Sequence, residues 1–205
     1  MKLYTSALKG LAIFVLGGCG AATQRGLYDA QRTESAIHRP LAATRVSTSP
    51  LLPNVARVDE NLFRGGKPKG KGFDELKAMG VKTVIDLGFY FFEIDNLRDA
   101  DLRYERIPFF TYRPKDSDVA RFLRIASDPA NGPVYVHCRR GADRTGMMVA
   151  MYRVVISGWS KEDAIAEMIG GGFGFDAQYQ NLIDYVQNAD VAAIAALAGL
   201  PTSSS

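Results

Sequence analysis

The amino-acid sequence predicts an α/β fold, a three-layer sandwich around a central mixed, largely parallel sheet. Apolar runs rich in β-branched residues at 81–87 and 133–137 have the length and composition of buried strands. Segments with helical character follow both runs, and strands that alternate with helices are typical of sheets covered by helices. The chain has 205 residues, of which 47% are hydrophobic and 23% charged, which suits one domain of ordinary size with additional tails.

The predicted domain extends from residue 54 to residue 190. It begins with a hairpin, in which 55–58 and 62–64 are strands around the turn residues Asp59, Glu60 and Asn61. The next elements are a helix at 73–79 that stops at Gly80, a strand at 81–87, a partly helical segment at 89–101, a strand at 103–108, a helix at 117–127, a strand at 133–137 and a helix at 145–157.

Residues that can satisfy free backbone N–H groups mark the helix starts in the second half of the chain. Ser117 is expected to cap the helix at 117–127, and Ser160 with Asp163 resembles a capping box that opens the next helix. A glycine-rich loop at 170–174 then precedes an amphipathic helix at 176–188. Residues 191–205 are expected to form a short helix of small residues and a disordered tail that ends in serines.

The N-terminal segment has the pattern of an export signal: two lysines, a short apolar core and small residues, namely Lys2, Lys9, 11–16 and Gly17-Gly18-Cys19. The sequence around Cys19 resembles a bacterial lipobox. It implies that 1–18 are a signal peptide, that Cys19 is lipidated, and that 19–53 are a flexible tether to a membrane. The expected location is therefore the periplasm or outer membrane as an exported lipoprotein, or the outside of the cell if the signal is simply cleaved.

Composition argues against several other classes of protein. No apolar run approaches the ~20 residues that a membrane-spanning helix needs. A net charge of +3 is too small to indicate a nucleic acid as partner, and none is expected. With Cys19 acylated, Cys138 would be the only remaining thiol, and a lone thiol in an oxidising compartment is a hazard unless it is buried or useful.

Residues 134–146, Val-Tyr-Val-His-Cys-Arg-Arg-Gly-Ala-Asp-Arg-Thr-Gly, are the most informative stretch of the chain. They are predicted to form the end of a strand, a tight loop and the start of a helix. Such a loop can point its backbone N–H groups inward with a helix N-terminus behind them. This arrangement binds anions, and phosphate in particular.

Cys138 is expected at the floor of this loop, where the amides, the helix and Arg144 favour a thiolate well below the free thiol pKa of about 8.5. A thiolate that faces phosphorus is a nucleophile and can form a phosphocysteine. Arg144 can bind two phosphoryl oxygens with its planar guanidinium group. Gly141 lets the loop bend, Thr145 can donate a hydrogen bond to the sulfur, and His137 is expected to orient the loop.

With this loop, the sequence resembles the cysteine-dependent protein tyrosine and dual-specificity phosphatase superfamily, most of all its compact bacterial and atypical dual-specificity members. The resemblance covers roughly 55–188 and includes 61–68, 80–87 and 107–108. It implies two-step hydrolysis of a phosphate monoester through a phosphocysteine, without a metal or other cofactor. It also implies that the phosphoryl group is bound by the loop residues Arg139, Arg140, Gly141, Ala142, Asp143 and Arg144.

An enzyme of this kind needs a carboxylic acid that protonates the leaving oxygen, a step that contributes ~10²–10⁴ in rate. Asp143 lies within the loop, in a pattern that resembles myotubularin-like lipid phosphatases, where an in-loop Asp is a proposed acid. Asp116 and Asp118 lie upstream of the nucleophile, where many members of the superfamily carry the acid. Helix capping is a serious alternative role for Asp116 and Asp118, and pairing with an arginine is the alternative for Asp143.

The sequence leaves the substrate open between a phosphorylated protein and an inositol phosphate or phosphoinositide. Arg139 and Arg140 add positive charge that suits inositol phosphates, or they simply face solvent. The aromatic run 89–92 could line a phosphotyrosine pocket, although burial in the core is expected. Because the acid is uncertain, an inactive pseudophosphatase that only binds phosphorylated ligands is the alternative to an enzyme.

Overall fold

The computed structural model describes residues 42–89 and 101–201, and every structural statement below refers to these residues. They form a six-stranded sheet with the strand order β1-β2-β3-β6-β4-β5. The strands are β1 (Thr44–Arg45), β2 (Ala56–Arg57), β3 (Leu62–Gly66), β4 (Thr83–Asp86), β5 (Arg103–Arg106) and β6 (Val134–Cys138). The pairs β1–β2 and β2–β3 are antiparallel and the other three pairs are parallel, so the predicted mixed, largely parallel sheet is confirmed.

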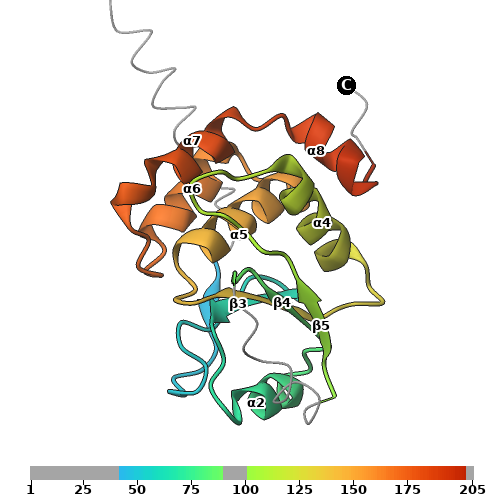
Figure 1. The fold of residues 1–205 in the computed structure, drawn as a ribbon, viewed down its shortest axis with the longest axis vertical. Helices are drawn as coiled ribbons and strands as arrows, with labels where there is room; N and C mark the ends of the chain where they lie inside the picture. Colours follow the sequence, from blue (N-terminus) through green and yellow to red (C-terminus); the bar gives the residue numbers. More distant parts are fainter. Residues whose placement is uncertain (1–41, 90–100, 202–205) are drawn as a thin grey trace, which may run out of the picture. The chain divides into compact units, whose positions relative to one another are not determined.

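Helices cover both faces of this sheet, as the three-layer prediction requires. They are α2 (Gly72–Ala78), α4 (Asp116–Ser127), α5 (Asp143–Val155), α6 (Lys161–Gly170), α7 (Gln180–Asn188) and α8 (Val191–Ala198), with the 3₁₀ turn η1 (Ala177–Tyr179). Helix α2 lies on one face, and α4 to α8 lie on the other (Figure 1). The buried residues of α5 are on all sides of the helix, because it is surrounded by other elements.

Strand β6 shows how the two faces are filled. Successive side chains of a strand point to opposite faces of the sheet. Val134 and Val136 belong to the large core under α4 and α5, whereas Tyr135 belongs to a smaller core with Phe73 and Leu76 of α2. A strand that is buried on both faces is apolar throughout, which is why a continuous apolar run predicted it.

Parallel pairing brings the C-terminal ends of β3, β6 and β4 to one edge of the sheet. In the register of these strands, Gly66 lies opposite Cys138, and Asp86 lies opposite His137. Loops that leave the C-terminal ends of neighbouring parallel strands meet at that edge, which is the usual ligand site of open α/β sheets. The fold thus places residues 139–142 where a ligand is expected.

Residues 42–53 belong to the folded unit, whereas the sequence predicted a flexible tether up to residue 53. Thr44–Arg45 pairs with Ala56–Arg57, and the Ala43 N–H donates a hydrogen bond of 2.6 Å to Oε1 of Glu167. Leu52 is buried. The expected domain boundary at Asn54 is therefore too late, because a strand of two residues is too short to leave a periodic signal in the sequence.

The predicted hairpin is confirmed as β2 and β3. Its turn is held by the Asp59 carboxylate, which accepts hydrogen bonds of 2.9 Å from the N–H groups of Asn61 and Leu62. This side chain–backbone pattern is typical of Asp in turns, and it explains why the turn residues were informative.

One predicted helix cap is confirmed and another is wrong. The Ser160 hydroxyl accepts a hydrogen bond of 3.0 Å from the Asp163 N–H and caps α6. Ser117 does not cap α4, because the helix begins one residue earlier, after Lys115, and has no side-chain cap. Asp116 and Asp118 lie in its first turn instead, where negative charge interacts favourably with the helix dipole.

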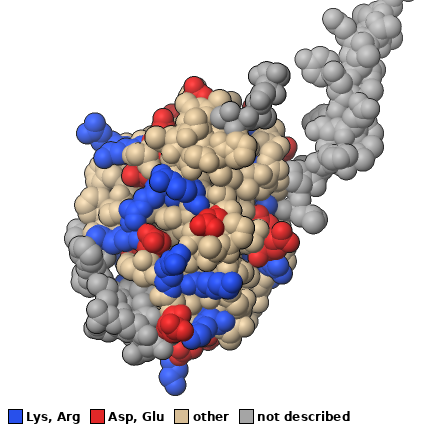
Figure 2. All heavy atoms as spheres, turned by 90° about the vertical axis from the view of Figure 1, so that its right-hand side faces the viewer, with Lys and Arg blue, Asp and Glu red and all other residues tan. Residues whose placement is uncertain are grey.

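Helix α4 and strand β5 lie on the side of the domain that faces the viewer in Figure 2. Lys and Arg side chains lie beside Asp and Glu side chains on this face. One ion pair joins the two elements, with 3.0 Å between Nη2 of Arg121 and Oε2 of Glu105. Exposed pairs of this kind contribute little to stability, so α4 is held mainly by its buried apolar side.

Several expectations concern residues outside the described ranges. These are the signal peptide at 1–18, the lipidated Cys19, the tether up to residue 41, residues 90–100 of the segment expected to be partly helical, and the tail at 202–205. Within the described ranges, no helix is both long and apolar enough to cross a membrane.

A buried ion pair joins α5 to α6. Arg153 and Glu167 are only 3% and 7% exposed, with 3.2 Å between Nε and Oε2 and 3.1 Å between Nη2 and Oε1. The Arg153 guanidinium also lies 4.2 Å from the centre of the Trp159 ring. Since Glu167 also accepts the Ala43 N–H, this pair ties both helices to the N-terminal segment.

Removing one partner of this pair should be much more harmful than removing both charges. Arg153→Met leaves the buried Glu167 carboxylate without its bidentate cationic partner and should lower the free energy of unfolding by about 3–5 kcal/mol in urea denaturation. The double variant Arg153→Met/Glu167→Gln should regain most of this loss, because the amide keeps an acceptor for Ala43 and carries no charge. An equal loss in the single and double variants would contradict this account of the pair.

Candidate active site

Residues 139–142 form a tight loop between β6 and α5, and its shape depends on Gly141. This residue has a φ of +73°, in the left-handed region that favours glycine. A Cβ atom here would also overlap the backbone of Gly65 and Gly66 in β3. The loop therefore packs directly, backbone to backbone, against the end of β3. The predicted bend at Gly141 is present.

Cys138 ends β6 at the floor of this loop and is 2% exposed. Its Sγ atom accepts a hydrogen bond of 3.3 Å from the Gly141 N–H. Helix α5 begins at Asp143, so the partial positive charge of a helix N-terminus also lies close to the sulfur. The amide and the helix both stabilise negative charge on this sulfur, which a thiolate nucleophile requires.

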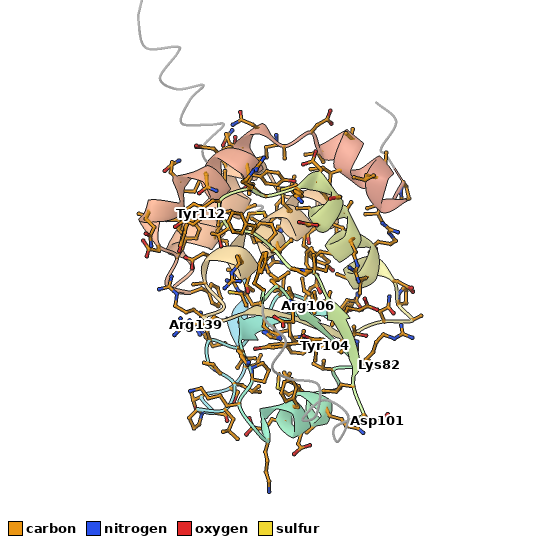
Figure 3. All side chains as sticks on the ribbon, viewed as in Figure 1. Lys82, Asp101, Tyr104, Arg106, Tyr112 and Arg139 are labelled. Atoms are coloured by element: carbon orange, nitrogen blue, oxygen red, sulfur yellow. The ribbon has the colours of Figure 1, made fainter. Side chains whose placement is uncertain are left out.

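A cavity of about 490 Å³ opens at Cys138, and it joins the loop to two other segments of the chain. It is lined by Thr111, Cys138, Arg139, Arg140, Asp143, Arg144, Asp176, Gln178 and Tyr179. Arg139 lies on the same side of the molecule as Tyr112, the neighbour of Thr111, whereas Lys82 and Asp101 at the starts of β4 and β5 lie on the other side (Figure 3). The cavity is therefore at the C-terminal edge of the sheet.

Arg144 lies in the first turn of α5 and lines the cavity beside Cys138. Its Nη1 atom donates a hydrogen bond of 3.1 Å to the carbonyl oxygen of Leu87, directly after β4. This contact fixes one side of the guanidinium group and leaves its other N–H groups for an anion in the cavity. Arg144 and Cys138 thus line the same cavity, as the sequence predicted.

Asp143 is 7% exposed and connects the loop to the segment before η1. Its Oδ2 atom accepts a hydrogen bond of 2.8 Å from Nη2 of Arg140, and its Oδ1 atom accepts one of 2.9 Å from the Asp176 N–H. The Asp143 hydrogen bond and charge raise the pKa of Arg140. Both carboxylate oxygens thus have donors, and the predicted pairing with an arginine is formed.

Asp116 and Asp118, the other two acid candidates, are not among the residues that line this cavity. Oδ1 of Asp116 accepts a hydrogen bond of 2.6 Å from the hydroxyl of Tyr185 on α7, and burial together with this contact raises the pKa of Tyr185. Partial burial raises the pKa of Asp118, against the opposing charges of Lys115 and Arg121. Both carboxylates are at the start of α4, where they support the helix.

His137 lies under the loop rather than in the cavity. Its side chain is 1% exposed and stacks on Tyr135 with 5.7 Å between the ring centres. Its Nδ1 atom is 3.9 Å from Oδ1 of Asp86, and Asp86 accepts hydrogen bonds from the Tyr104 hydroxyl and the Gly88 N–H. A role in orienting the loop fits this position and stays a prediction.

Thr145 follows Arg144 in the first turn of α5 and is fully buried. Its hydroxyl oxygen has no hydrogen-bond partner within the part of the chain that the structure describes. The predicted hydrogen bond from Thr145 to the Cys138 sulfur is therefore not formed in this structure.

Four cavity residues were not predicted from the sequence. Thr111 comes from the loop after β5, Asp176 directly precedes η1, and Gln178 and Tyr179 lie within it. The Asp176 carboxylate caps η1 by accepting the Gln178 N–H at 3.1 Å. An Asp side chain that accepts the N–H of the residue two positions later is typical of turns, but the contact of Asp176 with the loop depends on a residue far away in the sequence, Asp143.

A row of aromatic rings leads from β4 to the cavity. Its ring centres are 5.9 Å apart for Phe89 and Phe110, 6.2 Å for Phe110 and Tyr112, and 5.7 Å for Tyr112 and Tyr179. Phe89 is 53% exposed, so its expected burial in the core is wrong. The reason is that the chain leaves the sheet after Leu87 at the open edge; residues 90–92 of the same run lie outside the described ranges.

Comparison with known proteins agrees with this geometry. The family described as "DSP-PTPase phosphatase fused to NAD+ Kinase" matches residues 47–181. The dual specificity protein phosphatase TpbA of Pseudomonas aeruginosa is 33% identical over 193 residues, which cover 92% of this chain and 85% of that protein. The inositol diphosphatase DSP5 of Arabidopsis thaliana is 29% identical over 126 residues, 56% of this chain and 60% of that protein.

Solved structures of TpbA superimpose on the described fold. A crystal structure has a TM-score of 0.69 and 32% identity, and covers 78% of this chain and 98% of that chain. A second, of a cysteine-to-serine variant in complex with phosphotyrosine, has a TM-score of 0.69 and 31% identity, and covers 79% of this chain and 98% of that chain. The chain therefore belongs to the dual-specificity phosphatase family and is a cysteine-dependent phosphatase.

Proposed function

We propose that this phosphatase acts on phosphotyrosine in proteins, with Cys138 as the nucleophile at the floor of the cavity. The observation that carries the proposal is the hydrogen bond from the Gly141 N–H to the Cys138 sulfur, inside a loop that also presents Arg144. The complex of the TpbA variant with phosphotyrosine supports the choice of substrate. Tyr179 in the cavity wall and Tyr112 beside it provide aromatic surface for the substrate ring.

The reaction has two steps. In the first, the Cys138 thiolate forms a sulfur–phosphorus bond while the bond from phosphorus to the tyrosine oxygen breaks, and an acid gives that oxygen a proton. In the second, the carboxylate that the acid has become takes a proton from a water molecule, the water oxygen attacks phosphorus and the sulfur–phosphorus bond breaks, so that inorganic phosphate is released and the thiolate and the protonated acid are regenerated. Loop N–H groups and Arg144 bind the phosphoryl oxygens, whose charge spreads in both transition states.

Replacing the nucleophile and the phosphate-binding arginine should separate chemistry from folding. We expect Cys138→Ser to abolish hydrolysis of a phosphotyrosine peptide, and Arg144→Lys to lower kcat by roughly 10²–10³-fold, because a planar bidentate donor is lost in the transition state. Steady-state kinetics without added metal measures both changes, with Arg121→Lys, on the exposed face of α4, as the matched control that keeps full activity. Turnover by Cys138→Ser would contradict the assigned nucleophile.

An inositol phosphate or phosphoinositide is the second candidate substrate. Arg139 and Arg140 at the cavity rim provide positive charge, and the matching inositol diphosphatases support this choice. The same assay on an inositol polyphosphate and on a phosphotyrosine peptide distinguishes the two. A higher kcat/KM on the inositol polyphosphate would replace the protein substrate by this one.

Asp143 is the proposed acid, because it lines the cavity and Asp116 and Asp118 do not. Its Oδ2 atom is held by Arg140, whose side chain is 56% exposed at the rim and is free to move to an incoming phosphate. That movement would release one carboxylate oxygen for a proton. The Asp176 N–H would still hold the other oxygen and keep the group in place.

The leaving group reveals whether Asp143 transfers a proton. We expect Asp143→Asn to lower kcat by ~10²–10⁴-fold for a phenyl phosphate with a poor leaving group and far less for one whose leaving group needs no proton. The amide oxygen still accepts the Asp176 N–H, so the loop contact survives. Asp116→Asn and Asp118→Asn serve as controls with unchanged rates. Equal losses on both substrates would assign Asp143 a structural role, and a loss in a control would assign the acid to α4.

Export and lipidation at Cys19 complete the proposed function. The apolar core at 11–16 followed by Gly17-Gly18-Cys19 supports a lipoprotein signal. Acyl chains on Cys19 would anchor the enzyme to a membrane outside the cytoplasm, where a phosphotyrosine substrate must also lie.

Lipidation makes a prediction that fractionation can test. The wild-type protein should sediment with membranes and Cys19→Ala should become soluble, because each buried methylene of an acyl chain contributes about 0.8 kcal/mol to membrane binding. Cys138→Ala is the matched control and should sediment like the wild type. Unchanged sedimentation of Cys19→Ala would remove the anchor from the proposal.

A further inference from the structure

Arg64 is an arginine inside the protein, directly under the phosphate-binding loop. It lies in β3, is 0% exposed, and is the largest of the fully buried side chains in the described ranges. Burying a charged side chain costs free energy unless other groups compensate it, so this position needs an explanation. The reaction described above does not use it.

The contacts of Arg64 point to the loop. Its Nη2 atom donates a hydrogen bond of 3.0 Å to the carbonyl oxygen of Gly141. Its guanidinium group lies 3.7 Å from the centre of the Phe173 ring, which the glycine-rich segment before η1 supplies. Its Nε and Nη1 atoms have no hydrogen-bond partner among the described residues. The group is thus aimed at the loop without being fully satisfied.

The charge of Arg64 is kept in spite of this burial. Burial lowers the pKa of Arg64 to about 10, and the negative charges of Glu167 and of an ionised Cys138 act against this lowering. The group therefore remains cationic at neutral pH. Its interaction with Cys138 is mutual: a cation that is stabilised by the thiolate also stabilises the thiolate.

The hydrogen bond from Arg64 also determines which way a loop amide points. The N–H and C=O groups of a trans peptide point in opposite directions. Because the Gly141 carbonyl is turned inward to Arg64, the Ala142 N–H of the same peptide must point outward, toward the side where an anion binds. On the other side of Gly141, its own N–H is turned to the Cys138 sulfur.

We propose that Arg64 is a positioning residue of this phosphatase, which fixes the Gly141–Ala142 peptide in its phosphate-binding orientation and stabilises the Cys138 thiolate with a buried positive charge. A purely structural contact to the Gly141 carbonyl would need only a neutral donor. Glu167 already has Arg153 as a bidentate partner, so Arg64 is not needed to neutralise it. Glu167 and an ionised Cys138 both favour the charge of Arg64, and Cys138 is the one that binds Gly141, the residue that Arg64 contacts.

The test is the pH dependence of alkylation at Cys138 in the full-length protein, measured with iodoacetamide and quantified by mass spectrometry on the peptide that contains Cys138. Arg64→Gln keeps a donor for the Gly141 carbonyl but no charge, whereas Arg64→Lys keeps both. We expect the midpoint of the pH profile to rise by about one unit in Arg64→Gln and to stay near the wild-type value in Arg64→Lys. Vanadate should inhibit Arg64→Met, which has neither group, more weakly than Arg64→Gln.

Arg45→Met is the matched control. Arg45 is exposed, lies 4.6 Å from the centre of the same Phe173 ring and donates a hydrogen bond to the Gly172 carbonyl, but within the described ranges it donates none to residues 139–142. Its pH profile should equal that of the wild type. Thermal unfolding of each variant shows whether it is folded. If Arg64→Met does not fold, the pH profiles of Arg64→Gln and Arg64→Lys still test the proposal.

This inference rests on the proposed function, because it takes Cys138 to be the nucleophile. Two outcomes show which of the two has failed. Coincident pH profiles for the wild type and Arg64→Gln would overturn the role of Arg64. A wild-type profile like that of a free cysteine would instead overturn Cys138 as an activated nucleophile. Alkylation of Cys138 needs no substrate. Both pH profiles can therefore be interpreted even if the proposed phosphotyrosine substrate is wrong.

Discussion

The close approach of two backbones, at Gly141 in the phosphate-binding loop and at Gly65 and Gly66 in β3, is the constraint on which the site depends. No side chain fits between them, so the loop must turn sharply at that point, and the turn brings the Gly141 N–H to the Cys138 sulfur. The parallel register of β3 and β6 sets up the contact, because it places Gly66 directly beside Cys138. The pairing of β3 with β6 therefore determines where the Gly141 N–H lies relative to the Cys138 sulfur.

Polar groups hold this loop from three directions. Arg144 reaches across to the end of β4 through the Leu87 carbonyl, and Asp143 holds the segment before η1 through the Asp176 N–H. Below the loop, Arg64 holds the Gly141 carbonyl. Asn54 adds a further link, since its side-chain amide donates to the carbonyls of Arg140 and Phe173. A loop fixed in this way is organised before any substrate arrives, which is what transition-state stabilisation by backbone amides requires.

The parts of the structure that the sequence predicted well are those with local causes. Strand β6 and the nucleophile loop were identified because an apolar run, a cysteine, a glycine and an arginine all lie within a short segment. The parts that were missed depend on distant contacts. Thr111 and Tyr179 are brought together by long-range contacts, among them the hydrogen bond from the Asn181 side chain to the Thr111 carbonyl and the contact of Tyr112 with Tyr179, and nothing in their neighbourhoods in the sequence marks them. Arg64 was hidden for another reason: a basic residue in a strand is normally exposed, so burial could not be inferred from its type.

Local signals also failed where two explanations competed for one residue. Ser117 is a good helix cap by type, but α4 starts before it and the two flanking carboxylates occupy the first turn. Asp143 forms the predicted pair with an arginine, through Arg140, and it also lines the cavity, so its predicted role as the acid stays open. Sequence pattern gives the residue types that are able to do a task, and geometry then decides which of them are close enough to do it.

The pairing of Thr44–Arg45 with β2 has a practical consequence for anyone who expresses the catalytic domain alone. A shortened version that starts at residue 54 would lack strand β1 and the Ala43 N–H group that donates a hydrogen bond to Glu167. Glu167 also binds Arg153 of α5, the helix that begins directly after the phosphate-binding loop, so the truncation would weaken the packing of that helix. Recombinant versions that begin before Ala42 keep this support, and their kinetics describe the intact enzyme.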